Sequence, residues 1–155
     1  MTLTQKEKML LQDLKTEEQL CVDKYKKYAE TAHDGHLQQL FNQIGQTEQG
    51  HLNTINTMLQ GETPQVSASN SKSAKKQPAQ NVSGYTAKAR SKDKQQDCYL
   101  CTDALSTEKH VSSVYDTCVF EFAQPPLRNV LNHIQGEEQH HGEQIYNYMS
   151  ESGMV

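Results

Sequence analysis

Apolar side chains recur at three- and four-residue steps in two stretches near the start of the chain, which is the spacing of one helix face. The first stretch predicts a helix from about Gln5 to Ala32, which ends at His33-Asp34-Gly35. The second predicts a helix from about Leu37 to Leu59, which ends before Gly61 and Pro64. The two stripes are Leu10, Leu14, Glu18, Cys21, Tyr25 and Tyr28, then Leu37, Leu40, Phe41, Ile44, Glu48, His51, Ile55 and Met58.

The same periodicity returns in the last third of the chain. It predicts a third helix from about Cys98 to Ala123, and Pro125-Pro126 ends this helix and starts a fourth that runs to about Ser150. The tail, Glu151 to Val155, is expected to fray. The stripes are Cys101, Leu105, Glu108, Val111, Tyr115, Cys118 and Phe122, then Leu127, Val130, Leu131, Ile134, Glu138, His141, Ile145 and Met149.

Residues 62–95 have a different composition, rich in Ser, Lys, Gln and Ala and poor in large apolar residues. This segment holds seven of the fifteen basic residues, opposed only by Glu62 and Asp93. Such a composition cannot bury enough surface to order itself, so it predicts a solvated linker. An alternative role for its Lys and Gln residues is contact or cross-linking in an assembly.

The two helical halves repeat each other at an offset of 90 residues without a gap. The matched positions are Leu10 and Leu100, Asp13 and Asp103, Glu18 and Glu108, Tyr25 and Tyr115, Leu37 and Leu127, Ile44 and Ile134, Glu48 and Glu138, His51 and His141, and Ile55 and Ile145. The repeat therefore contains a lone glutamate followed by a Glu-x-x-His motif, twice.

Glutamate inside an apolar stripe needs an explanation, because a buried unpaired carboxylate is costly. Counted from the first helix break, Glu18 lies ~26 Å along one helix, and Glu48 and His51 lie ~20 and ~24 Å along its antiparallel neighbour. These side chains therefore meet near one level. One Glu from each of two helices, with Glu-x-x-His from each of the other two, is the ligand set of a carboxylate-bridged di-metal site in a four-helix bundle.

The repeat also predicts the role of each ligand. Glu48 and Glu138 would bridge two metals ~3.5–4 Å apart. Glu18 with His51 would complete one metal position, and Glu108 with His141 the other. Iron or manganese suits this mixed ligation, with zinc as an alternative. Tyr25 and Tyr115 are candidates to hydrogen-bond a ligand carboxylate or to be oxidised.

Other motifs are weaker. Glu137-x-x-His140 has the same spacing, but Thr47 and Gly50 occupy the matching places, so Glu17, Glu137 and His140 are interpreted as flanking or outer groups. His33, His36, His110 and His133 are expected at the surface. Cys98-x-x-Cys101 could be redox-active or share a metal, but no second cysteine pair completes a tetrahedral site and Cys101 lies on a core stripe.

The predicted fold is an all-α four-helix bundle made of two repeated helical hairpins, 5–60 and 96–150, within a single domain 1–155. A long crossover linker, 62–95, would return the chain along the bundle, as in ferritin-like folds. The two hairpins therefore resemble the ferritin-like superfamily.

Composition limits the other possibilities. At 155 residues the chain is large enough for one domain with a real core. A net charge of −4 gives no argument for nucleic acid. No apolar run is long enough for a membrane span and the first residues lack a signal peptide, so synthesis in the cytosol is expected. The four cysteines are expected to be thiols.

Residues 103–154 resemble the coat F family of bacterial spore coat proteins, through LSTEKH, FEFAQPPLR, LNHIQGEEQHH and YNYMSESGM. The resemblance implies a spore coat component made in the mother-cell cytoplasm, with other coat proteins and further copies of itself as partners. It implies no catalysed reaction. Two alternatives stay open: a di-metal oxidase, ferroxidase or peroxide-decomposing enzyme, and a metal-free structural interaction module.

Overall fold

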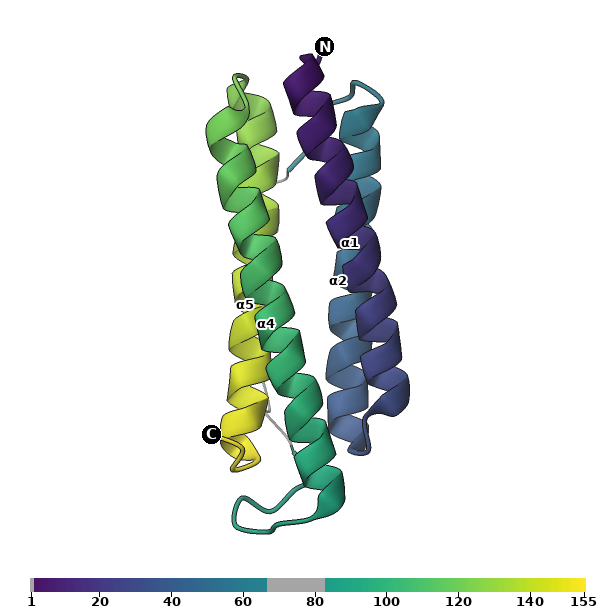
Figure 1. Ribbon diagram of the computed structural model, residues 1–155, viewed down its shortest axis with the longest axis vertical. Coiled ribbons are helices and arrows are strands. Elements are labelled where there is room, and N and C mark those ends of the chain that lie inside the picture. Colours follow the sequence, from purple (N-terminus) through teal and green to yellow (C-terminus); the bar gives the residue numbers. More distant parts are fainter. Residues whose placement is uncertain (1, 67–82) are drawn as a thin grey trace.

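The computed structural model describes residues 2–66 and 83–155, and these residues form four helices and no strand. The helices are α1 (Gln5–Thr31), α2 (Gly35–Leu59), α4 (Lys92–Glu121) and α5 (Pro125–Glu151). They lie side by side as an elongated all-α bundle (Figure 1). Within this part of the chain, none of the helices combines the length and apolar character needed to span a membrane.

The bundle consists of two antiparallel hairpins. α1 packs chiefly against α2, and α4 against α5, while α1 also contacts α4 and α2 contacts α5. α2 ends at the end of the bundle where α1 begins, whereas α4 begins at the opposite end (Figure 1). The two ends of the connection between them therefore lie at opposite ends of the bundle (Figure 1). Residues 67–82, about half of the predicted basic linker, lie outside the described residues.

The helix bounds agree with the sequence prediction except at the start of α4. This helix begins at Lys92, six residues before the expected Cys98, so the last residues of the predicted linker are helical. The Ser91 hydroxyl accepts a hydrogen bond from the Lys94 backbone N–H at 3.1 Å, and Asp93 lies in the first turn. A serine cap followed by an acidic residue favours a helix start, and the basic composition concealed it.

The apolar core consists of two clusters at different levels of the bundle. One contains Leu11, Leu14, Ile55 and Met58 among others, and the second contains Tyr25, Phe41, Ile44 and Ile145 among others. On each helix the candidate metal ligands lie between residues of these two clusters, with only Cys21 of the first cluster beyond Glu18. Three predicted stripe positions, Leu10, Leu40 and Leu105, are only partly buried. Leu11 and Ala104, next to two of them, are fully buried instead.

An unpredicted polar contact holds the α1–α2 turn against the start of α4. The fully buried carboxylate of Asp97 accepts hydrogen bonds from the backbone N–H groups of His33 and Asp34, each at 2.9 Å. It also accepts one from the Tyr85 hydroxyl at 2.6 Å. Asp97, near the start of the second hairpin, thereby satisfies amides in the turn of the first hairpin.

Asp97→Ala is expected to destabilise the protein by ~2–4 kcal/mol, because three donors would lose their acceptor and two of them are turn amides. Urea unfolding followed by circular dichroism measures this change. Asp116→Ala, which alters an exposed aspartate on the same helix, is the matched control and should leave the midpoint nearly unchanged. Equal midpoints for the two variants would contradict the role given to Asp97.

The C-terminal tail is ordered rather than frayed as expected. Ser152 is fully buried and its hydroxyl lies 2.6 Å from that of Ser83. Gly153 has φ +68°, and the Met154 N–H donates to the Met149 carbonyl at 2.8 Å. A glycine in the left-handed region lets the chain fold back over the last turn and satisfy its carbonyls, which is a common helix ending.

Candidate metal centre

Six ionisable side chains meet at mid-bundle, on the stripe positions that the repeat predicts. Each helix supplies one glutamate, and the second helix of each hairpin also supplies a histidine one turn later. All six are buried, with at most 4% of any residue exposed. They are Glu18 on α1, Glu48 and His51 on α2, Glu108 on α4, and Glu138 and His141 on α5.

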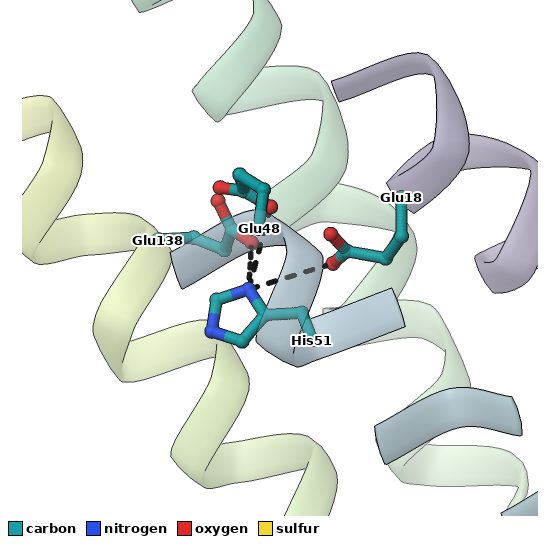
Figure 2. Close-up of side chains that lie close together, drawn as sticks. All are labelled: Glu18, Glu48, His51 and Glu138. Atoms are coloured by element: carbon teal, nitrogen blue, oxygen red, sulfur yellow. Dashed lines mark hydrogen bonds and ion pairs between the residues drawn. The ribbon is translucent and has the colours of Figure 1, made fainter. Parts of the chain in front are cut away.

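Glu48 and Glu138 each face both imidazoles, because each carboxylate directs one oxygen toward His51 and the other toward His141. His51 Nδ1 lies 2.9 Å from Glu138 Oε1 and 3.3 Å from Glu48 Oε2 (Figure 2). His141 Nδ1 lies 3.0 Å from Glu48 Oε1 and 3.5 Å from Glu138 Oε2. The imidazole rings stack with centroids 6.0 Å apart. A carboxylate with one oxygen directed to each of two sites has the geometry of a bridge.

Glu18 and Glu108 each face one imidazole only. Glu18 Oε1 lies 3.8 Å from His51 Nδ1, and Glu108 Oε1 lies 3.5 Å from His141 Nδ1. The same oxygens accept hydrogen bonds from the other hairpin: Tyr115 donates to Glu18 at 2.5 Å, and Tyr25 donates to Glu108. The two contacts are reciprocal, as the repeat requires. Each tyrosine therefore fixes a carboxylate across the hairpin boundary.

Both of these carboxylates leave their second oxygen buried without a hydrogen-bond partner. Glu18 Oε2 and Glu108 Oε2 share this condition, although they come from different helices. Glu138 Oε2 is a third such oxygen in the cluster. Buried carboxylate oxygens are nearly always satisfied in folded proteins, so these exceptions need an explanation. A cation between each oxygen and the neighbouring histidine would supply one.

The donor set divides into two overlapping groups within the described residues. Glu18, Glu48, His51 and Glu138 form one, and Glu48, Glu108, Glu138 and His141 form the other; in each, the four donor atoms lie within 4.8 Å of one another. Two divalent cations would balance four carboxylates. Carboxylate oxygens with imidazole nitrogens fit iron, manganese or zinc.

Without a cation, the buried ionisable groups of the cluster shift one another's pKa values. Burial, aided by the nearby Glu48 carboxyl, raises the pKa of Glu18 to about 11, and burial raises the pKa of Glu108 to about 9. Burial disfavours the charged imidazoles, but hydrogen bonds to the carboxylates prevail and raise the pKa of His51 to about 12 and that of His141 to about 11.

The pKa of Glu138 shifts in the opposite direction to the pKa values of Glu18 and Glu108. Burial acts to raise its pKa, but hydrogen bonds from His141 and His51 outweigh burial and lower that pKa well below the usual range. The cluster therefore holds protons at neutral pH on both imidazoles and on Glu18 and Glu108.

Metal binding should consequently release protons and strengthen as pH rises. A cation needs the imidazole lone pairs and ionised carboxylates, and the raised pKa values keep these groups protonated at pH 7. Apparent affinity should increase by about tenfold per pH unit for each proton released. Manganese(II) titrations by calorimetry in buffers of different ionisation enthalpy, between about pH 6 and pH 8, measure both quantities. An affinity independent of pH would contradict this account.

Of the three flanking residues named from the sequence, Glu137 lies beside a candidate ligand, whereas His140 and Glu17 pair with residues outside the cluster. Glu137 Oε1 lies 3.4 Å from His51 Nε2, on the side away from the other ligands, so Glu137 is an outer group as predicted. His140 is exposed and lies 3.6 Å from Glu143, and Glu17 lies 3.3 Å from the exposed His110. The four cysteines are free thiols, and Cys101 is buried in the core.

Fold and site together define an all-α bundle with a buried carboxylate–imidazole cluster at its middle. A family model for the Coat F domain matches residues 96–155, which contain α4, α5 and the C-terminal tail. This match supports a relation to the spore coat family for the second hairpin. No curated protein and no solved structure matches the chain. Glu108, Glu138 and His141 lie inside the matched segment, and the other three cluster residues lie outside it.

Proposed function

We propose that this chain is a spore coat component whose ferritin-like bundle holds a carboxylate-bridged di-metal centre. Glu48 and Glu138 would bridge the metals, with Glu18 and His51 completing one position and Glu108 and His141 the other. Iron or manganese is the preferred pair, with zinc as an alternative. In this role the metals stabilise the bundle inside an assembly of coat proteins.

The observation that supports the metal centre is the pair of overlapping donor groups, in each of which three carboxylates and one histidine place donor atoms within 4.8 Å of one another. The coat role is supported by the Coat F match over residues 96–155. Assembly there also calls for self-association and for contacts with other coat proteins.

Recovery of the chain from spores tests the coat role. A fluorescent fusion expressed during sporulation should form a ring around the developing spore, and the untagged chain should be recovered in coat extracts of purified spores. A chain that stays in the mother-cell cytoplasm and is absent from coat extracts would overturn this part of the proposal.

A second candidate function is a di-metal oxidase, ferroxidase or peroxide-decomposing enzyme. The observation that favours it is the hydroxyl of Tyr25 on Glu108 and that of Tyr115 on Glu18, because each places an oxidisable ring beside a candidate ligand. Bound iron or manganese would supply redox chemistry toward oxygen or peroxide. The tyrosines would orient the carboxylates and exclude water from the centre.

Peroxide consumption by the iron- or manganese-loaded chain tests this alternative. Turnover that is lost in His141→Ala and reduced in Tyr25→Phe would support an enzyme. A loaded chain that leaves peroxide and oxygen unconsumed would leave the structural role. The third alternative is a metal-free interaction module, in which replacement of the buried carboxylates leaves folding unchanged or improves it.

A further inference from the structure

A hollow lies on the outer side of His51, between α2 and α5, and shares only this histidine with the candidate centre. Its volume is about 270 Å³, several times the ~30 Å³ that a water molecule occupies in the liquid. Pro64, Gln65 and Val66 form part of its wall. The hollow therefore has room for a hydrated cation beside the centre.

The polar side chains of the hollow form a chain from solvent to the buried histidine. His133 Nε2 lies 2.8 Å from Glu137 Oε1, and the same oxygen lies 3.4 Å from His51 Nε2. The side chains of His133 and Glu137 are 40% and 38% exposed, against 5% for His51. Glu137 thus lies between the solvent and the centre.

The His51 side chain separates the hollow from the candidate centre. Its Nδ1 faces the carboxylates of Glu48 and Glu138, whereas its Nε2 is buried 3.4 Å from Glu137 Oε1 and makes no hydrogen bond. The residue as a whole borders the hollow. An imidazole with one nitrogen toward the carboxylates and the other toward Glu137 can contact a cation on either side. Rotation of this side chain into the hollow would open the centre without moving a helix.

Glu137 and His133 have no residues of the same type at the matching positions of the 90-residue repeat. At the 90-residue offset, Thr47 corresponds to Glu137 and Gln43 corresponds to His133, so the first half of the repeat has uncharged residues at both places. The ligands themselves are conserved within the repeat, and this outer pair is not. A charged pair beside only one of the two imidazoles suits a task that a symmetric centre needs once, such as the entry of metal.

We propose that Glu137 and His133 form an entry site, which captures a divalent cation from solvent and delivers it past His51 to the candidate centre. This inference rests on the proposed di-metal function. A carboxylate at the mouth of a hollow raises the local concentration of cations and their association rate. Carboxylate and imidazole also ligate the same metals as the centre, so transfer between the two sites requires no change of ligand type.

The rate of metal loading tests the entry site. Cobalt(II), used as the probe, is mixed with the metal-free chain and followed by stopped-flow absorbance, and elemental analysis gives the final stoichiometry. Glu137→Gln should load about tenfold more slowly. Dissociation into a chelator should slow by the same factor, so that Kd and stoichiometry stay as in the wild type. Glu137→Asp should restore part of the rate.

His140→Gln is the matched control, because His140 is an exposed histidine on the same helix that does not line the hollow. It should load at the wild-type rate. Glu137 is partly exposed, so its amide variant is expected to fold, and a melting curve verifies this.

Three results would overturn the inference. Loading of Glu137→Gln at the wild-type rate would remove the entry site and leave the di-metal function intact. Faster dissociation with an affinity lowered by about 10–100-fold would show that Glu137 only orients His51 as an outer partner. Failure of the wild-type chain to take up cobalt would refute the di-metal function itself, and the entry site with it.

Discussion

Glu48→Gln is expected to empty both metal positions, whereas Glu18→Gln should empty only one. Glu48 presents one oxygen to His141 and the other to His51, so its loss removes a ligand from each position. Glu18 approaches only His51. The loss of affinity in Glu48→Gln should exceed the ~10–100-fold that follows removal of an outer partner. Elemental analysis after anaerobic manganese(II) loading should find ~2 metals in the wild type, ~1 in Glu18→Gln and ~0 in Glu48→Gln.

The matched control is Glu30→Gln, an exposed glutamate on α1 that should leave the metal content unchanged. Glu138→Gln should behave like Glu48→Gln, and Glu108→Gln like Glu18→Gln, because the contacts are reciprocal between the hairpins. If Glu18→Gln emptied both positions while Glu48→Gln emptied one, the assignment of bridging and terminal ligands would be reversed.

The second large effect concerns the stability of Glu18→Gln relative to the wild type, which should change sign between the metal-loaded and metal-free forms. Metal should stabilise the wild type by ~4 kcal/mol at a free concentration ~1,000 times Kd. This corresponds to a rise in Tm on the order of 10 °C for a domain of this size. Glu18→Gln should gain clearly less from the same metal, because one of its two positions is incomplete.

Without metal, Glu18→Gln should be the more stable of the two proteins. The pKa of Glu18 is about 11 in the folded chain and near 4.5 when unfolded, so the metal-free wild type loses stability as pH rises between these values. Glutamine resembles the protonated acid and does not ionise. Glu18→Gln should therefore be more stable than the wild type at pH 7, by on the order of 1–3 kcal/mol, since one pKa unit corresponds to about 1.4 kcal/mol. Urea unfolding in chelator measures this difference.

The same comparison at lower pH is the internal control. Near pH 4.5 the Glu18 carboxyl of the unfolded chain is itself about half protonated, so the two states differ little in proton binding and the advantage of Glu18→Gln should shrink. A metal-free variant less stable than the wild type at pH 7, with no dependence on pH, would contradict the protonated state assigned to the empty cluster.

The sequence was sufficient to predict the helices and the cluster, because both depend on periods along the chain. A 3.6-residue period places side chains on one face, and the 90-residue repeat gives each ligand a partner at the same height. Glu18, Glu48 and His51 therefore needed only helix rise and one antiparallel turn to be placed at one level. The metal ligation, the ferritin-like relation and the extent of the domain remain predictions.

Contacts between distant segments were not predictable in this way. Asp97 contacts backbone groups 63 and 64 residues away, and no local pattern marks it. The prediction that Tyr25 could hydrogen-bond a ligand carboxylate is confirmed, but the sequence did not indicate which one. Its hydroxyl reaches Glu108 on the other hairpin, because the long side chain crosses the gap between α1 and α4. The start of α4 at Lys92 had a local signal in Ser91, but the surrounding basic composition outweighed it.

Elemental metal content is the most direct test of the central claim. The purified chain is analysed as isolated and after anaerobic loading with iron(II) or manganese(II), followed by removal of free metal. The account predicts about two metals per chain, lost when Glu48 and Glu138 are both replaced by glutamine. A chain that binds neither metal after loading would contradict the di-metal centre and leave a four-helix bundle with a buried, protonated cluster.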